Sequence, residues 1–149
     1  MEVLLVIDMQ QKYMKDYEPD LISRVNVRIQ EAVSKNRPII YVKNIGNPEN
    51  EEKYVLADGL NVATKYVFKK KWPSAFSSKE FVNFVEDIGV DAFDVVGVDG
   101  RCCVAQTALE AKKRGYTTRL FLDSVAARSD NFYVKELPQM EEAGIEIIT

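Results

Sequence analysis

Two adjacent cysteines, Cys102 and Cys103, follow a buried apolar run at the start of a helical pattern, and the chain contains no histidine. A thiol in the first turn of a helix lies near free backbone N–H groups and the positive end of the helix dipole, which favour the thiolate. Such a cysteine is a candidate nucleophile. Because there is no imidazole, its base or electrostatic partner has to be an aspartate, a glutamate or a lysine.

The elements that would position these groups alternate between buried apolar runs and amphipathic helices. Apolar runs predict strands at residues 2–7, 39–42, 65–68, 93–98, 117–122 and 145–148. Helical spacing predicts helices over residues 20–35, from Ser77 or Ser78 through residue 85, from the cysteines to Gly115, and over residues 133–143, while residues 44–59 form a polar surface loop. This alternation predicts a three-layer α/β/α fold, Rossmann-like, with a parallel sheet and right-handed crossovers.

Length and composition describe one folded domain over residues 1–149. The chain is 46% hydrophobic and 29% charged, which is typical of a soluble globular protein that needs neither disulfides nor metals for its core. A net charge of −3 gives no general attraction to nucleic acid or to anionic membranes, and no apolar run approaches the ~20 residues of a membrane helix. Residues 1–8 are typical of a strand and not of a signal peptide, and the two adjacent cysteines fit a reducing compartment. We expect a cytoplasmic protein with no nucleic-acid or membrane partner, and homo-oligomerisation stays open.

Three predicted strands end in groups that could act together. Asp8 follows the first strand, the lysines at 69–71 follow the third, and the cysteines follow the fourth. In a parallel α/β sheet the carboxyl ends of the strands meet at one edge, where ligands bind. Each group also has a simpler explanation: Asp8 could cap a turn, the lysines could be a solvated charged run, and a cysteine is often a small core residue.

Three segments together resemble the signature motifs of isochorismatase-like cysteine hydrolases. They are LLVIDMQ at residues 4–10, KKWPSAF at residues 70–76 and GVDGRCCV at residues 97–104. The resemblance implies a six-stranded sheet, with Asp8 as the base, Lys70 as the family lysine and Cys103 as the nucleophile. It also implies a cis peptide at Val98-Asp99 and an oxyanion hole at Asp99 and Cys103. The cis peptide would aim the backbone N–H groups into that hole.

The chain departs from this family pattern in the segment after the second strand. Metal-dependent members carry an Asp-x-His type of site there, whereas this chain has Asn44 and several glutamates and no histidine. We therefore expect no metal and no other cofactor, and nicotinamide is doubtful as the substrate. Aromatic and charged side chains near the motifs are candidate walls of the substrate pocket: Tyr13, Trp72, Phe76, Asp99 and Arg101.

These observations favour a cysteine hydrolase that cleaves a small amide, or a related acyl or C–N bond, through a thioester. The alternative is a binding or regulatory protein that keeps the fold without the activity. A haloacid-dehalogenase type of phosphatase is excluded because Gln10 stands where a second aspartate is needed, and a dinucleotide fold is excluded because the first turn has no glycines. If Lys70 and the helix outweigh Asp8, Cys103 should be alkylated in preference to Cys102 at neutral pH.

Overall fold

The computed structural model describes the backbone of all 149 residues and the side chains of residues 1–47 and 49–149. The strands are β1 (Glu2–Ile7), β2 (Ile39–Asn44), β3 (Val67–Lys70), β4 (Ala92–Val98), β5 (Thr117–Ala126) and β6 (Glu146–Ile148). The α-helices are α1 (Leu21–Ser34), α2 (Lys79–Ile88), α3 (Cys103–Lys113) and α4 (Leu137–Glu142). Shorter helical turns are η1 (Gln11–Asp16), η2 (Pro48–Tyr54), η3 (Ala75–Ser77) and the π-helical η4 (Phe132–Glu136).

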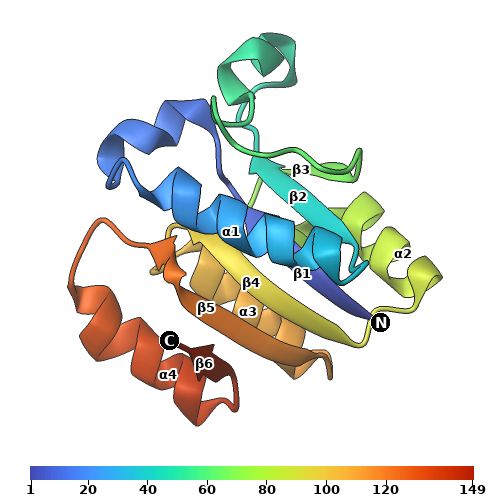
Figure 1. The fold of residues 1–149 in the computed structure, drawn as a ribbon, viewed down its shortest axis with the longest axis vertical. Helices are drawn as coiled ribbons and strands as arrows, with labels where there is room; N and C mark the ends of the chain where they lie inside the picture. Colours follow the sequence, from blue (N-terminus) through green and yellow to red (C-terminus); the bar gives the residue numbers. More distant parts are fainter.

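The strands form one sheet in the order β3-β2-β1-β4-β5-β6, and all neighbouring pairs are parallel. This arrangement confirms the predicted α/β fold with a six-stranded parallel sheet. Helix α1 lies on one face of the sheet and α2 and α3 lie on the other (Figure 1). The strand order reverses between β1 and β4, so the crevice beyond their carboxyl ends is the expected ligand site. That residues 1–149 form a single domain stays a prediction.

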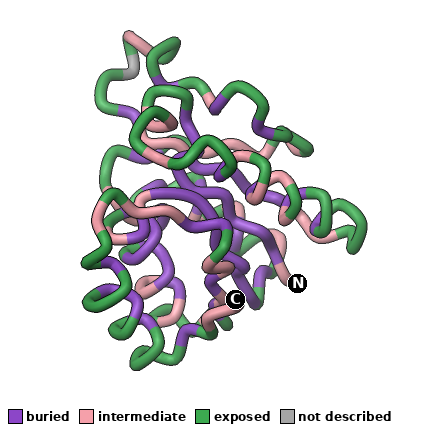
Figure 2. Tube along the Cα trace, turned by 60° about the vertical axis from the view of Figure 1, so that its left-hand side comes forward, coloured by how far each residue is buried: buried purple, intermediate pink, exposed green. Residues whose placement is uncertain are grey.

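The central strand β1 shows why the sheet is covered on both faces. Val3, Leu5 and Ile7 belong to the apolar cluster on the side of α2 and α3, whereas Leu4 and Val6 belong to the cluster on the side of α1. Successive side chains of a strand point to opposite faces, so a continuous apolar run requires cover on both. The buried strands run through the middle of the molecule in Figure 2. No helix in the described part of the chain is long and apolar enough to cross a membrane.

Two strands differ from their predicted ranges in a way that affects the site. Strand β3 ends at Lys70 and not at residue 68, because Lys69 and Lys70 continue the ladder opposite Lys43 and Asn44 despite their charge. Strand β5 continues to Ala126 and not to residue 122, past a register shift opposite β4. Both extensions carry polar residues toward the carboxyl edge of the sheet, and a prediction based on apolar runs does not recognise such residues as strand.

The predicted C-terminal helix over residues 133–143 is divided into η4 and α4. Pro138 lies in the first turn of α4, where its missing N–H costs no helical hydrogen bond.

The N-terminal cap of α2 is Ser78 and not Ser77. The Ser78 hydroxyl oxygen accepts a hydrogen bond from the Phe81 N–H at 3.2 Å.

Gly97 allows β4 to pass close to the end of β1. It has a φ of +122°, and a Cβ built on it would lie 2.1 Å from the Ile7 carbonyl oxygen. No other residue fits at this separation, because the clash is with backbone that cannot move aside. The close approach brings the residues after β4 beside Asp8, the residue that follows Ile7.

Candidate active site

A cavity of about 160 Å³ lies at the carboxyl edge of the sheet, where the strand order reverses. The groups around it come from the ends of β1, β2 and β4, from η1 and from the segment after β5. Its lining residues are Asp8, Tyr13, Tyr17, Asn44, Val98, Asp99, Cys102, Cys103 and Arg128. The structure brings Asp8 and Cys103, two of the groups named by the strand-end argument, to this cavity together with Asp99.

Asp8 is held in a tight turn directly after β1. Its φ of +52° is in the left-handed region, which is uncommon for a residue other than glycine and is tolerated best by Asp and Asn. Its N–H donates to the Val42 carbonyl at 3.0 Å, and its own carbonyl accepts from the Gln10 N–H at 2.8 Å. These two hydrogen bonds fix the point from which the carboxylate projects.

Lys70 reaches Asp8 from the end of β3, two strands away. Its Nζ donates to Asp8 Oδ2 at 3.0 Å, and the two side chains are 0% and 4% exposed. The other carboxylate oxygen, Oδ1, has no hydrogen-bond partner among the described residues. Burial raises the pKa of Asp8 above its ordinary value, and the Lys70 ammonium opposes this rise only in part.

Cys103 is the first residue of α3 and is 8% exposed. The pKa of its thiol is raised to about 12, above all by burial. The negative charge of Asp8 contributes to this rise, and its effect is larger than the opposing effect of the Lys70 ammonium. The resting Cys103 side chain is therefore a thiol. The condition for preferential alkylation of Cys103, that the helix and Lys70 outweigh Asp8, is therefore not met, because desolvation and Asp8 together have the larger effect on the pKa.

Alkylation should accordingly favour Cys102. Cys102 is exposed and Cys103 is buried, and the pKa of about 12 leaves Cys103 almost entirely protonated at neutral pH. We expect iodoacetamide to label Cys102 first near pH 7, with labelling of Cys103 increasing as the pH rises toward its pKa. Peptide mass mapping across pH measures both rates, and faster labelling of Cys103 at pH 7 would contradict this electrostatic picture.

The Asp99 side chain organises the loop between β4 and α3. Its carboxylate accepts hydrogen bonds from the Arg101 N–H, the Arg128 N–H and the Tyr17 hydroxyl, each at 2.9 Å. The Val98–Asp99 peptide bond is cis. Within the described part of the chain, the backbone N–H groups of Asp99 and Cys103 have no hydrogen-bond acceptor. Both residues line the cavity.

Three predicted pocket residues lie elsewhere, whereas Tyr13 and Asp99 do line the cavity. Phe76 packs in the core against Phe81 at 5.2 Å and Phe93 at 6.0 Å, because the neighbouring Ala75 N–H is tied to the Thr107 hydroxyl on α3.

Trp72, in the turn after β3, is 69% exposed on the surface and so forms no wall of the cavity. The Arg101 guanidinium pairs with Glu136 at 2.8 Å and lines an adjoining hollow.

Sequence reasoning missed Tyr17, Asn44 and Arg128 as lining residues. Asn44 is the last residue of β2, so the strand-end argument could have found it once the strand was extended. Its main chain is held by the buried Gln10, whose amide accepts from the Asn44 N–H at 2.7 Å and donates to its carbonyl at 3.0 Å. Tyr17 and Arg128 carry no local signal, because only the tertiary fold brings them to Asp99.

Comparisons with known proteins agree with this architecture. The nicotinamidase/pyrazinamidase of Mycobacterium tuberculosis is 34% identical over 89 residues, which cover 54% of this chain and 48% of that protein. The pyrazinamidase of Pyrococcus horikoshii in complex with zinc has a TM-score of 0.78 at 23% identity, covering 99% of this chain and 98% of that one. N-carbamoylsarcosine amidase from Thermoplasma acidophilum has a TM-score of 0.82 at 21% identity, covering 99% and 95%. The matched segment spans about half the length of the M. tuberculosis protein, and the two structural likenesses establish the fold.

The donor groups of this chain do not fit a zinc ion like the one in the Pyrococcus complex. The chain has no histidine, and no group of three His, Cys, Asp or Glu side chains within the described residues is close enough to hold a metal. Zinc sites in proteins are built from His nitrogen, Cys sulfur and Asp or Glu oxygen ligands. The buried carboxylate beside the cavity, Asp8, is instead occupied by the ammonium of Lys70.

The family model for the isochorismatase domain matches residues 2–149. The match includes all three motif segments and every strand and helix described above. The chain therefore belongs to the isochorismatase-like hydrolase family.

Proposed function

We propose that this protein hydrolyses a small amide through a thioester on Cys103. The observation that carries the proposal is the convergence of a buried carboxylate, a buried ammonium and a thiol beside one cavity with two free backbone N–H groups. The names of its relatives, nicotinamidase, pyrazinamidase and N-carbamoylsarcosine amidase, describe amide hydrolysis. The chemistry uses only groups that this chain contains.

In the proposed first half-reaction, the Cys103 sulfur attacks the amide carbonyl carbon while its proton passes to the Asp8 carboxylate. The N–H groups of Asp99 and Cys103 hold the carbonyl oxygen as it gains negative charge. Asp8 then gives the proton to the nitrogen, the C–N bond breaks, and ammonia leaves. Proton transfer during attack avoids a free thiolate, which agrees with the high pKa of the resting thiol.

In the proposed second half-reaction, Asp8 takes a proton from a water molecule that attacks the thioester carbonyl. The same N–H groups hold the oxyanion, the C–S bond breaks, and the proton returns to sulfur. Lys70 keeps Asp8 in place and offsets its charge throughout, because its ammonium contacts Oδ2 at 3.0 Å. The products are a carboxylic acid and a restored Cys103 thiol.

A panel of small amides tests the proposal. Nicotinamide, pyrazinamide, N-carbamoylsarcosine, succinamate and butyramide would be incubated with the protein while ammonia is measured, and intact mass would detect an acyl adduct. We expect ammonia release and an adduct mapped to Cys103, with both retained in Cys102→Ala. Binding without ammonia release or an adduct for any amide would overturn the proposal in favour of a binding protein with the same fold.

The pH dependence follows from the raised pKa of Asp8. The carboxylate form of Asp8 is the base. Because burial raises the pKa of Asp8 above its ordinary value of 3.8, this form is protonated at a higher pH than that of an exposed aspartate. We expect kcat/KM to fall on acidification with a midpoint above 3.8, and to fall at still higher pH in Lys70→Met, where no ammonium opposes protonation. A pH profile of both proteins measures this, and a midpoint at or below 3.8 would rule out Asp8 as the base.

A further inference from the structure

Arg128 lies at the mouth of the cavity that contains Cys103. Its side chain is 60% exposed and lines both that cavity and an adjoining hollow of about 330 Å³. The hollow is bordered by Asp99, Arg101, Cys102, Arg128, Ser129 and Glu136. A ligand that enters toward Cys103 therefore passes the Arg128 guanidinium.

The two terminal nitrogens of the Arg128 guanidinium have no hydrogen-bond partner among the described residues. Within the described residues its contacts run through Nε alone, to the Tyr17 hydroxyl oxygen at 3.4 Å and to Asp99 Oδ2 at 3.6 Å. The two terminal nitrogens are left to face a ligand, and their fork matches the two oxygens of a carboxylate.

Asp99 forms an ion pair with Arg128 through Nε, and this contact leaves the two terminal nitrogens without a partner among the described residues. The Asp99 side chain is 12% exposed, and its oxygens accept three hydrogen bonds at 2.9 Å from Tyr17 and the main chain. Arg101 is paired with Glu136 at 2.8 Å, and Asp8 is paired with Lys70 deep in the site. The terminal nitrogens of Arg128 are thus the cationic donors, among the described residues that line the cavity, that have no protein partner.

The size of the cavity limits what can lie between Arg128 and Cys103. A closed cavity of ~150 Å³ holds a benzene-sized molecule, and the cavity beside Cys103 is about 160 Å³. Within this cavity, an amide carbonyl at Cys103 and an anionic group at Arg128 can therefore be joined by only a short chain. Sites for drug-sized ligands are larger, roughly 300–1,000 Å³.

We propose that the substrate is a short amide that carries a carboxylate, and that Arg128 determines this specificity by binding the carboxylate. This inference rests on the proposed amide hydrolysis. It adds a recognition element outside the reacting groups, in a segment that none of the three signature motifs includes.

Succinamate and butyramide form a matched pair of probes, because they differ in having a carboxylate or a methyl group at the end remote from the amide. We expect wild-type kcat/KM to be at least about 10-fold higher for succinamate, as a hydrogen-bonded charge implies. In Arg128→Gln this preference should disappear through a rise in KM for succinamate, with kcat and the butyramide constants little changed. Arg128→Lys should retain part of the preference, because it keeps the charge and loses the fork.

Arg114→Gln is the matched control, since it removes one positive charge from the residue that follows α3, at the opposite end from Cys103. The Arg128 N–H to Asp99 is main chain and survives both Arg128 replacements. Equal kcat/KM for the two probes in the wild type, or an equal loss for both in Arg128→Gln, would overturn the inference while amide hydrolysis stands.

Calorimetric binding to Cys103→Ala separates recognition from chemistry. We expect succinamate to bind this variant more tightly than butyramide, and to lose that advantage when Arg128→Gln is added. If succinamate binds in this way but neither probe nor any other amide is hydrolysed by the wild type, the hydrolase proposal fails and anion recognition by Arg128 stands. Equal binding of both probes would refute recognition directly.

Discussion

Replacing Cys103 with alanine is expected to reduce amide turnover by about 10⁴-fold or more, because no other group near the cavity can form the thioester. Cys102 cannot substitute for it: it precedes α3 and is exposed, whereas Cys103 is buried beside Asp8. Steady-state ammonia release with the best amide of the panel measures the loss.

Cys102→Ala is the matched control and should keep most of the activity. Asp8→Asn should be nearly as inactive as Cys103→Ala, and the double variant should be little worse than either single one, because the two groups act in one step. Wild-type activity in Cys103→Ala would refute the covalent mechanism. Additive losses would show that Asp8 and Cys103 act independently.

Replacing Lys70 with methionine is expected to destabilise the fold by about 3–5 kcal/mol at neutral pH, because it leaves the Asp8 carboxylate buried without its partner. The Lys70 and Asp8 side chains are 0% and 4% exposed, so little water reaches the carboxylate that methionine would leave unpaired. The penalty should shrink as the pH falls, because protonation of Asp8, whose pKa is already raised, removes the unpaired charge. Urea unfolding at several pH values measures this change.

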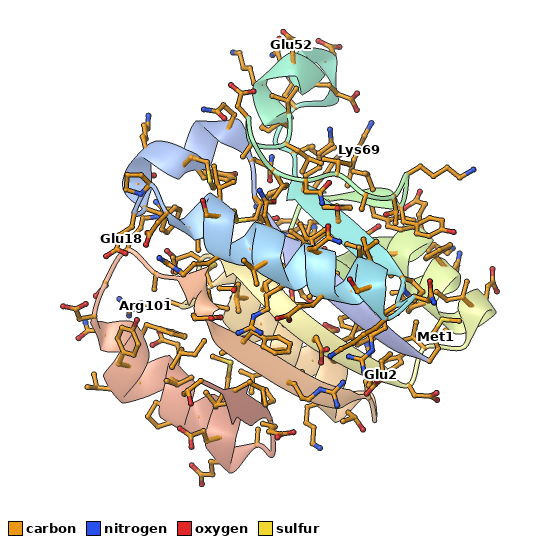
Figure 3. All side chains as sticks on the ribbon, viewed as in Figure 1. Met1, Glu2, Glu18, Glu52, Lys69 and Arg101 are labelled. Atoms are coloured by element: carbon orange, nitrogen blue, oxygen red, sulfur yellow. The ribbon has the colours of Figure 1, made fainter. Side chains whose placement is uncertain are left out.

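The double variant Asp8→Asn/Lys70→Met tests whether the loss comes from the unpaired charge. It should recover much of the stability of Lys70→Met, since a neutral amide replaces the carboxylate. Lys69→Met is the matched control on the same strand: Lys69 pairs with Glu51 at the surface, close to η2 (Figure 3), and its loss should cost less than about 1 kcal/mol. A larger loss for Lys69→Met than for Lys70→Met would contradict the assignment of the buried lysine.

The sequence by itself determined the parallel α/β fold and the location of the site. Apolar runs such as residues 2–7 require a sheet covered on both faces, and parallel strands bring their carboxyl ends to one edge. Both steps depend only on residues within each strand and on the parallel direction of the strands, so the sequence alone placed Asp8 and the cysteines at the same edge of the sheet. The missing histidine is equally a property of the sequence, and it already argued against a zinc site.

The choice among the lysines needed both the motif and the tertiary structure. Residues 69–71 are three consecutive lysines, and alternation along a strand sends neighbours to opposite sides. The structure buries Lys70 against Asp8 and leaves Lys69 at the surface. Burial then decided the ionisation of Cys103, because the competition among desolvation, Asp8 and Lys70 depends on distances that no motif contains.

The outer part of the site was decided by tertiary structure alone. Tyr17, Asp99 and Arg128 are distant in sequence and meet because Asp99 accepts hydrogen bonds from both of the others. Phe76 and Trp72 were predicted to line the pocket from their spacing to Lys70, but that spacing does not determine their packing. Phe76 packs against α2, and Trp72 is exposed to solvent. Regular patterns fix which residues share a strand end, whereas the side chains that surround a ligand depend on loops whose packing is set only when the whole chain has folded.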